Sequence, residues 1–530
     1  MWRSRLKNHL LLRLAASLLT IASRCLTAPP QNGTDAETIP NPKGQTIDVR
    51  RFGAIGDGQH DDTMPIQAAI DSVSSAGETV YFPSGKYRYR RLLINGKASL
   101  TLAGQHASLI EIGDGGGTEI VASPGADIRG LVFDHALHTG YILDITSPNV
   151  TIEGNTFENL GDGVHGDVEA AIYIAPGSHR ALVRGNSFLH LSGGPMGAVR
   201  GVYINNFRSR SEASYSARIL NNRFAMITSP VDADGIVIDQ QGFPSKATIE
   251  GNTFYNCSKR AVKLMSNENV VRNNTITVEK LKAQSYSAVS SYGDGNRVIG
   301  NHAKAVGCNK GCSFYCAWEL SGSDNVLLDN TAENPSDTVD KDIDCVAIIR
   351  PEAGQSLSNI LLRGNTCRKF RYIRIRADTP VRNLVIEDNH LFGFITQPVI
   401  AVYPHSPISG LSVVHNTADN DTVLLGFYEP GAAGKTKFDI SQNQGLIDLN
   451  LGDDPAPVSL KVQSPLVSAH GVEIMDIING QKRARGSGPP TGGYWRIGDL
   501  VYDANPSAKG LSGWKCVSAG ITGKWVRISP

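Results

Sequence analysis

The chain has 530 residues, more than one compact hydrophobic core supports, so it forms either several domains or one long repeat architecture. It carries 51 basic and 50 acidic residues, and the formal net charge of +1 excludes a global field that would draw it to nucleic acid or to an anionic membrane. The 55 glycines, with short runs of Val, Ile and Leu between Asn-rich turns, favour many short β-strands.

The first 28 residues are predicted to be an export signal. Their start is basic, an apolar run extends from Leu14 to Ala22, and no acidic residue precedes Asp35. An uncleaved membrane anchor is the alternative, although the run is short for a span of about 20 residues. No later segment is apolar enough to cross a bilayer, and residues 29–44 are predicted to be a polar linker. We therefore expect a secreted, periplasmic or cell-surface protein.

Residues 48–87 contain the first regular elements. A helix is predicted from apolar residues at helical spacing, with Asp61, Asp62 and Thr63 at its start and Gly77 at its end. The apolar residues of this helix are Ile66, Ala69, Ile70 and Val73.

The same segment contains Phe52-Gly53-Ala54, Gly56-Asp57-Gly58, Asp61-Asp62-Thr63 and the run from Val80 to Tyr87. Together these motifs resemble the opening of right-handed β-helices of the pectate lyase superfamily. Polygalacturonase-like hydrolases, polysaccharide lyases, mannuronan epimerases and phage tailspike depolymerases open in this way. The resemblance implies an all-β chain, with a single-stranded right-handed parallel β-helix over residues 45–485. It also implies structural roles for the motif residues, a helix that caps the solenoid, and a polysaccharide as the partner.

From Asn155 onward, a unit of strand, Asn and a small or apolar residue recurs at spacings of 22 to 36 residues. This spacing is typical of one solenoid coil per unit. The Asn side chains are predicted to stack at one corner of successive coils and to satisfy backbone groups there. They are Asn155, Asn186, Asn222, Asn252, Asn274, Asn301, Asn330, Asn365, Asn389 and Asn416.

A second type of strand alternates with this unit, and its segments can be aligned by their inward apolar pairs. The alignment gives three columns: the residues just before the segments, and the third and fifth residues of each segment, which point outward because side chains alternate between faces. The first column contains Arg200, Asp234, Arg260, Ser287, Cys316, Asp344 and Arg371. The second contains Tyr173, Tyr203, Val237, Lys263, Ser290, Glu319, Ala347 and Arg374. The third contains Ala175, Asn205, Asp239, Met265, Tyr292, Ser321, Ile349 and Arg376.

These columns predict a continuous polar face that suits an extended polymer, because adjacent strands lie only about 4.8 Å apart. Tyr173, Tyr203 and Tyr292 are expected to be exposed and to offer stacking surface for sugar rings. A structural ladder of salt bridges is the alternative, since Arg200, Asp234 and Arg260 alternate in sign. The substrate-binding candidates are Tyr173, Tyr203, Arg260, Tyr292, Asp344, Arg374 and Arg376.

Hydrolysis of an acidic polysaccharide is one reaction that the face could support. It needs two carboxyl groups, which Asp234 and Asp239 could supply together with Glu319 or Asp344. The segments around Asp234 and Asp344 resemble two polygalacturonase motifs. However, they lie about 110 residues apart and no Gly-His-Gly follows.

β-Elimination is the reaction that the interleaved cations favour. Lys263, flanked by Arg260, could remove the proton at C5 of a uronic acid, and Arg374 or Arg376 could hold the sugar carboxylate. Asp234, Asp239 and Glu319 could bind Ca²⁺, the one cofactor considered. A counter-ion role is the alternative for Lys263. The catalytic candidates are Lys263, Asp234, Asp239 and Glu319. Epimerisation ranks third because the Asp-Pro-His-Asp segment of mannuronan epimerases is absent, and a non-catalytic glycan-binding or assembly protein is the non-enzyme alternative.

The cysteines and the C-terminal region complete the predictions. Cys308, Cys312 and Cys316 match no zinc spacing, so a disulfide within their loop or a stack of small core residues is expected. The coil pattern fades near Gly445, and residues 486–493 are predicted to be a linker. Residues 494–530 are predicted to be a small Trp-rich β module, in which Trp495, Trp514 and Trp525 either form the core or contact glycan.

Overall fold

The computed structural model describes residues 44–113, 117–165, 168–207, 209, 211–279, 285–306, 314–334, 344–348, 356–394, 399–403, 405–406, 408–419, 423–427, 437–441, 446–447, 459–467, 471–478, 481–492, 494–505 and 512–528. The predicted export signal, the linker up to residue 43, Cys308 and Cys312 lie outside these residues. No helix in the described part of the chain is both long and apolar enough to span a bilayer.

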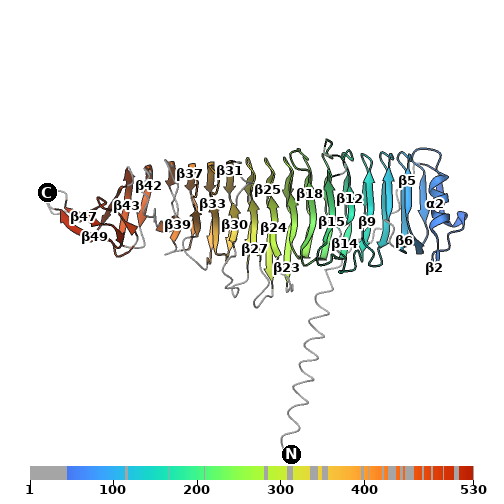
Figure 1. The fold of residues 1–530 in the computed structure, drawn as a ribbon, viewed down its shortest axis with the longest axis horizontal. Helices are drawn as coiled ribbons and strands as arrows, with labels where there is room; N and C mark the ends of the chain where they lie inside the picture. The colour runs from blue at the N-terminus through green and yellow to red at the C-terminus, as the bar shows by residue number, and fades with distance from the viewer. Residues whose placement is uncertain are drawn as a thin grey trace, which may run out of the picture. The chain divides into compact units, whose positions relative to one another are not determined.

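The chain beyond residue 43 folds as a parallel β-solenoid in which successive coils pair strand by strand (Figure 1). A middle coil consists of the strands β16 (Arg218–Leu220), β17 (Arg223–Thr228) and β18 (Asp232–Asp239). The next coil repeats them as β19 (Thr248–Glu250), β20 (Thr253–Cys257) and β21 (Arg260–Leu264). The first two strands of each coil belong to one large sheet and the third to a second sheet. The predicted all-β parallel β-helix is confirmed.

The second sheet, here called the site sheet, contains 14 strands in chain order within the described residues, and their pairings are parallel. Besides β18 and β21, its strands are β5 (Leu92–Asn95), β7 (Thr118–Val121), β9 (Tyr141–Thr146), β12 (Val168–Ile174), β15 (Ala198–Asn205), β24 (Ser285–Ser291), β27 (Phe314–Leu320), β30 (Asp344–Ile348), β33 (Tyr372–Arg376), β36 (Ile400–Tyr403), β39 (Val423–Phe427) and β41 (Leu446–Ile447).

The helix α2 (Thr63–Asp71) lies at the N-terminal end of the solenoid and buries Ile66, Ala69 and Ile70 (Figure 1). It ends at Ser72, whose Oγ donates to the carbonyl of Ala69 at 2.7 Å, so the predicted end at Gly77 is wrong. Gly77, with φ of 84°, lies instead in the turn before the next strand.

Asp62 directly precedes α2 but does not cap it with its side chain. Its carboxylate accepts the backbone N–H groups of Ile55 and Gly56 at 2.7 and 3.1 Å. The neighbouring Asp61 accepts the N–H of Thr63 at 3.1 Å. Asp62 therefore stabilises the preceding turn, whereas Asp61 accepts a backbone N–H group at the start of the helix.

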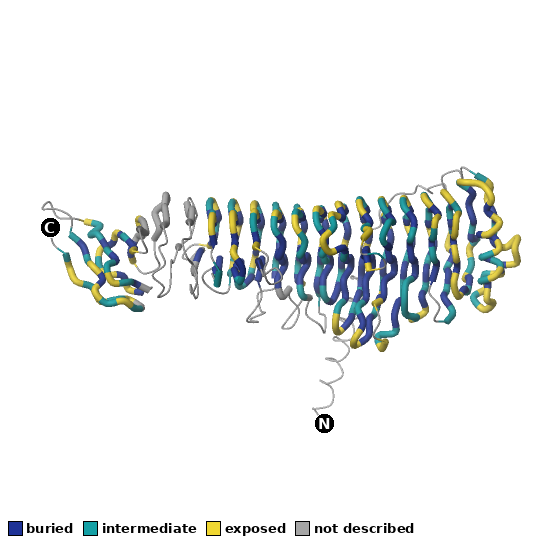
Figure 2. Tube along the Cα trace, turned by 45° about the horizontal axis from the view of Figure 1, so that its top comes forward, coloured by how far each residue is buried: buried dark blue, intermediate teal, exposed yellow. Residues whose placement is uncertain are grey.

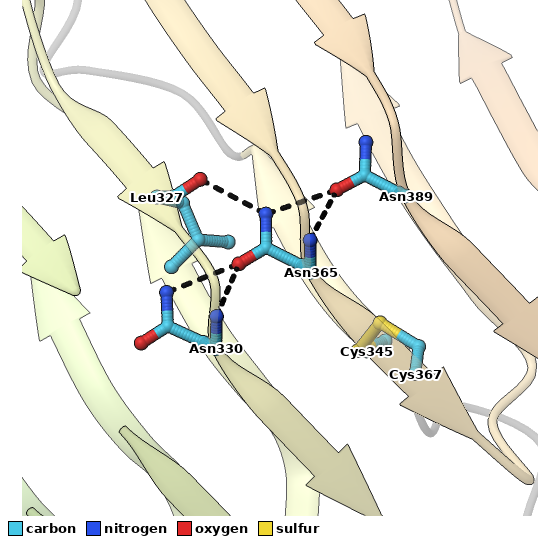
Figure 3. The surroundings of a disulfide bond; sticks show 6 residues. All are labelled: Leu327, Asn330, Cys345, Asn365, Cys367 and Asn389. Carbon is cyan, nitrogen blue, oxygen red and sulfur yellow. Dashed lines mark hydrogen bonds between the residues drawn. A yellow bond between two sulfur atoms is a disulfide. The ribbon is translucent and has the colours of Figure 1, made fainter. Parts of the chain in front are cut away.

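The predicted asparagine ladder is present at the corner between the two short strands of each coil (Figure 3). Asn365 donates Nδ2 to the carbonyl of Leu327 at 2.9 Å and to Oδ1 of Asn389 at 3.0 Å. Its own Oδ1 accepts the backbone N–H and Nδ2 of Asn330, both at 3.0 Å. The residue before each ladder Asn has a positive φ, as at Gly364 (67°), which turns the chain sharply at the corner.

Inward side chains of successive coils stack on one another and form the core. A column of buried phenylalanine rings runs through the first half of the solenoid, with neighbouring ring centroids 4.5 to 5.2 Å apart. Each ring lies two residues after a ladder asparagine or at the equivalent position of its coil, so ladder and stack reinforce the same register. The rings are Phe133, Phe157, Phe188, Phe224 and Phe254.

A disulfide joins Cys345 of β30 to Cys367 of β32 (Thr366–Arg368) inside the solenoid (Figure 3). The sequence does not predict it, because the two cysteines lie 22 residues apart and only the coil brings them together. Cys316, from the predicted disulfide loop, is a buried free cysteine. Its expected partners, Cys308 and Cys312, lie outside the described residues.

At the C-terminal end, the large sheet continues into antiparallel strands. β42 (Ser459–Val467) pairs with β43 (Val472–Ile478), which pairs with β44 (Gln481–Gly486). β44 then pairs with β46 (Leu500–Asp503), so strand pairing crosses the predicted linker at residues 486–493. Trp495 is buried and packs edge-on against Trp525 with centroids 5.1 Å apart, which supports the core role for these tryptophans.

Candidate functional site

The register of the site sheet brings the predicted columns together. In the second column, Tyr203 pairs with Val237, which pairs with Lys263, and the series continues through Ser290 to Glu319. This column is confirmed from Tyr173 to Arg374.

The other two columns are confirmed in part. The first is confirmed from Arg200 to Asp344 and is wrong at its last member, because an irregularity in β30 sets Tyr372 rather than Arg371 opposite Asp344. In the third column, Asn205 pairs with Asp239, and Ile349 lies outside the described residues.

The outward side of this sheet is largely shielded from water, contrary to the prediction. β15 and β18 are buried at six or more consecutive positions, whereas strands of the large sheet alternate (Figure 2). Inward and outward side chains are therefore both covered in the middle coils. Such double burial is typical of sheets that are packed on both faces.

Tyr173 and Tyr203 are only 3% and 2% exposed, so the expectation that they offer a free stacking surface is wrong. They form a small outer cluster in which Tyr141 stacks on Tyr173 with centroids 4.5 Å apart. Tyr173 donates its hydroxyl to Oδ1 of Asn205 at 3.0 Å, and Nδ2 of Asn205 donates to the hydroxyl of Tyr203 at 2.5 Å. These contacts bury the rings against their own sheet.

Asp232, which the sequence analysis does not single out, lies at the centre of a charged cluster. Its carboxylate is 3.1 Å from Nη1 of Arg260, 3.3 Å from Nη2 of Arg200 and 3.4 Å from Nζ of Lys263. It is missed because it precedes the aligned segment that starts at Gly235. The Asp-Ala-Asp spacing is a usable signal, because residues two apart on a strand share a face.

Asp234 lies beside this centre but in a different environment. It is fully buried, and neither carboxyl oxygen has a hydrogen-bond partner among the described residues. Nη1 of Arg260 lies 3.6 Å from its Oδ1. Burial, together with the charge of Asp232, outweighs the arginines and raises the pKa of Asp234 to about 6.

The pKa of Asp232 shifts the other way. Burial alone would raise it, but Lys263, Arg200 and Arg260 lower it below its usual value. Because the same Nη1 contacts Oδ1 of both aspartates, these two oxygens are no more than about 6.7 Å apart. Two carboxyl groups this close can act on one glycosidic bond, one as the acid and the other as the carboxylate.

Asp239 and Lys263 form the more open side of this cluster. Asp239 is half-buried at the end of β18, and burial raises its pKa while Lys263 and Arg200 oppose the rise. The side chain of Lys263 is 17% exposed and that of Asp232 is 20% exposed. The solvent-facing part of the cluster is thus the ion pair of the Lys263 ammonium and the Asp232 carboxylate.

Glu319 belongs to a second cluster, further along the site sheet. It accepts hydrogen bonds from the hydroxyls of Tyr292 at 2.8 Å, Tyr286 at 3.4 Å and Ser290. Arg260 connects the two clusters, because its Nε donates to Ser290 Oγ at 3.0 Å and its Nη2 to the Tyr292 hydroxyl at 3.3 Å.

The predicted Ca²⁺ ligands Asp234, Asp239 and Glu319 do not converge. Glu319 is on β27, three strands from β18, which corresponds to about 14 Å across the sheet, whereas Ca²⁺ takes ligands at about 2.3–2.6 Å. Within the described ranges, no group of three His, Cys, Asp or Glu side chains could hold a metal ion. We therefore assign no metal to these residues.

The remaining candidates lie further along the sheet. Nε of Arg374 is 2.8 Å from Oδ2 of the buried Asp344, while Arg376 pairs with Asp378 at 3.0 Å near the surface. The predicted site residues thus lie along one sheet in four groups: the tyrosine cluster, the Asp232 cluster, the Glu319 cluster and the Arg374–Asp344 pair, while Arg376 pairs separately. The Asp232 cluster is the most highly charged of them.

Comparison with known proteins gives one family match. Residues 46–285 match the family model described as rhamnogalacturonase A/epimerase, pectate lyase-like, which is slightly less than half of the chain. Two proteins of Azotobacter vinelandii show local similarity. Mannuronan C5-epimerase AlgE3 is 42% identical over 78 residues, 13% of this chain and 4% of that protein. Alginate lyase 7 is 43% identical over 76 residues, 13% of this chain and 9% of that protein.

The chain therefore spans less than a tenth of the length of these two relatives. Among solved structures, the tailspike protein of E. coli bacteriophage HK620, in complex with a hexasaccharide, superimposes with a TM-score of 0.55 at 14% identity. The superposition covers 78% of this chain and 80% of that one, and it concerns the fold alone. The stacked parallel coils give the chain the fold of a right-handed parallel β-helix, and over residues 46–285 it is similar to the rhamnogalacturonase A/epimerase, pectate lyase-like family.

Proposed function

We propose that the chain is an exported enzyme that hydrolyses an acidic polysaccharide at the Asp232 cluster. The observation that carries this proposal is the pair of carboxyl groups on β18, Asp232 and Asp234, whose pKa values shift in opposite directions. A pair tuned in this way supplies an acid and a base at the same pH. The family match and the local similarity to two alginate-modifying enzymes support a polysaccharide as substrate.

Asp234 is the proposed general acid. With a pKa of about 6 it keeps its proton in mildly acidic solution and can give it to the glycosidic oxygen as the C–O bond breaks. Asp232, held ionised by its three cations, activates the water that adds to the sugar, or attacks the sugar directly. Activity should therefore fall as the pH rises above about 6.

Access to Asp234 requires a movement of its side chain, because Asp232 and Lys263 are the solvent-facing members of the cluster. Neither oxygen of Asp234 makes a hydrogen bond within the described part of the chain, so rotation toward a bound sugar breaks none there. A bound polymer would also displace water from the partly exposed pair, which strengthens charge interactions there.

Arg200 supports an acidic substrate. It is 7% exposed, and its Nε and Nη1 have no hydrogen-bond partner in the residues that the structure describes. A buried donor without an acceptor costs free energy, and the carboxylate of a uronic acid supplies acceptor oxygens. Arg200 lies directly opposite Asp234 on the neighbouring strand, so such a carboxylate would sit beside the proposed acid.

β-Elimination is the second candidate, and the position of Lys263 beside Arg260 on one strand favours it. The ion pair between Nζ of Lys263 and Asp232, at 3.4 Å, instead supports a counter-ion role for Lys263. We therefore rank hydrolysis first. Non-catalytic glycan binding is the remaining outcome of the test.

The test is to incubate the purified chain with a panel of uronate-containing polysaccharides. Reducing ends and the ultraviolet absorbance of unsaturated uronates are followed together. Hydrolysis gives new reducing ends without the absorbance of unsaturated uronates, whereas elimination gives both. Binding without new ends would refute an enzymatic role.

Three variants assign the roles at this cluster. Asp234→Asn and Asp232→Asn should each lower kcat by at least about 100-fold. Lys263→Ala should keep turnover within about tenfold, because Lys263 serves as a counter-ion. The exposed Asp388, which lies away from the site sheet, provides the matched control Asp388→Asn. New absorbance that disappears in Lys263→Ala would establish elimination instead.

A further inference from the structure

Arg260 is held at every nitrogen of its guanidinium group. Nη1 contacts the carboxylates of Asp232 and Asp234 at 3.1 and 3.6 Å. Nε and Nη2 point the other way and donate to Ser290 Oγ and the Tyr292 hydroxyl at 3.0 and 3.3 Å. One buried side chain thus links the proposed catalytic pair to a group of hydroxyls.

Three hydroxyls on this far side, those of Tyr286, Ser290 and Tyr292, converge on Glu319, and Ser290 Oγ also lies 2.6 Å from Ser287 Oγ. Oε2 accepts hydrogen bonds from Ser290 Oγ and, at 2.8 Å, from the Tyr292 hydroxyl. Oε1 accepts the hydroxyl of Tyr286 at 3.4 Å, and the Tyr286 ring lies 4.6 Å from the guanidinium of Arg260. Glu319 itself is 3% exposed.

The direction of these hydrogen bonds has a physical consequence. A hydroxyl has one hydrogen and can accept from Arg260 only if that hydrogen points elsewhere. Glu319 accepts the hydrogens of both Ser290 and Tyr292, so their oxygens face the guanidinium with lone pairs. Without this acceptor the Tyr292 hydroxyl could turn its hydrogen toward the cation, and Nη2 would lose its partner, whereas Ser290 could still donate to Ser287 Oγ at 2.6 Å.

We propose that Glu319, with Tyr286, Ser290 and Tyr292, is a positioning cluster that holds Arg260 against the carboxylates of Asp232 and Asp234. The inference rests on the proposed function, because it assigns a task to Arg260 in that reaction. It also reassigns Glu319, a predicted catalytic residue, to a role that acts through another side chain. The carboxylate oxygens of Glu319 accept hydrogen bonds from three hydroxyls of the same sheet.

The role of Arg260 sets the expected effect. Its positive charge favours the ionised form of both aspartates, so a loosened Arg260 lets both pKa values rise. The reaction needs Asp232 ionised and Asp234 protonated. Both limbs of the pH–rate profile should therefore move to higher pH in a Glu319 variant, by about half a unit to one unit.

The test measures complete pH–rate profiles of the full chain with the polysaccharide it cleaves. Glu319→Gln should shift both limbs upward and lower kcat by about tenfold, with KM changed less than about threefold. Tyr292→Phe should give a smaller shift in the same direction. The matched control is Glu279→Gln, which removes a carboxylate that accepts a tyrosine hydroxyl, Tyr255, at 2.6 Å on the large sheet. The control should leave the profile unchanged.

Two results would overturn the inference. A loss of more than about 1000-fold at every pH in Glu319→Gln would make Glu319 a catalytic residue. A profile like that of the native chain in both Glu319→Gln and Tyr292→Phe would show that the cluster does not position Arg260. If Glu319→Gln does not fold, the Tyr292→Phe profile decides alone.

A second readout separates this inference from the proposed function. The difference in unfolding free energy between a chain and the same chain carrying Asp234→Asn, followed against pH, reports the pKa of Asp234 whether or not the chain is an enzyme. A shift of this dependence to higher pH in Glu319→Gln supports the positioning role. Full activity of Asp234→Asn would refute the proposed function but would leave the positioning role standing. No shift in either readout refutes the positioning role.

Discussion

Replacing Asp234 with asparagine is expected to stabilise the protein at neutral pH while removing its proposed general acid. Asp234 is fully buried, and its oxygens make no hydrogen bonds with the described residues. Its charged form is therefore poorly compensated, although Arg260 lies 3.6 Å away. Asparagine keeps the shape of the side chain and carries no charge, so the variant avoids the cost of ionising this position.

The size of the effect follows from the pKa. The ordinary value is 3.8 and the folded value is about 6, so between these values the folded state binds more protons than the unfolded state. Stability contributed by this position is therefore lost as the pH rises from about 4 to about 6, and the loss persists at higher pH. A shift of roughly two units corresponds to about 3 kcal/mol at pH 7.

The assay is chemical denaturation at pH 4, 5, 6 and 7, followed by circular dichroism. Asp234→Asn should be more stable than the native chain by up to about 3 kcal/mol at pH 7 and nearly equal to it at pH 4. Asp232→Asn is the matched control two residues away, and it should be less stable than the native chain. Asp232 contacts three cations, and removing one partner of a buried ion pair costs about 3 kcal/mol or more. A destabilised Asp234→Asn, or a difference that does not change with pH, would refute the reasoning.

Three further predictions concern the solenoid. Asn252→Ala removes the acceptor of the Asn222 N–H at 2.9 Å and leaves buried backbone groups without partners, so the unfolding free energy should fall by about 2–5 kcal/mol. The control Asn95→Ala, at an exposed position, should change the denaturation midpoint little. Phe224→Ala opens a gap in the phenylalanine stack and should cost about 3–5 kcal/mol by the same denaturation assay. Replacing Cys345 and Cys367 by serine should lower the unfolding free energy under oxidising conditions by about 3 kcal/mol and the thermal midpoint with it. The midpoint of this variant should no longer depend on reductant. A native-like midpoint in any of the three variants would contradict the corresponding role.

The repeat can be predicted from sequence because it is local and periodic. The asparagine at each corner marks each coil, and the alternation of apolar residues indicates which side chains of a regular strand point inward. Periodicity alone therefore places Tyr203, Lys263 and Glu319 in one column, and their strand pairing agrees with this placement. The misplaced Arg371 lies where β30 is irregular, a feature that periodicity does not encode.

Burial of the site cannot be predicted in the same way. A column alignment gives neighbours along the sheet but not what covers the sheet from outside. Tyr173 and Tyr203 are therefore expected to be exposed, whereas they pack on their own neighbours. Asp232 is missed for a related reason, because the alignment begins only at the apolar core of each strand. The disulfide between Cys345 and Cys367 depends on contacts across a coil that sequence spacing does not reveal.

Burial also bears on the choice between a structural and a functional interpretation of the charged column. On a solvated face, alternating charges such as Arg200, Asp234 and Arg260 would contribute little and would need no further explanation. Here the same column is withdrawn from water, and a buried carboxylate without hydrogen bonds from the described residues is costly. A purely structural ladder would gain stability by replacing Asp234 with a neutral residue. An acidic group at a position that disfavours its charged form fits the proposed catalytic acid better than it fits a salt-bridge ladder.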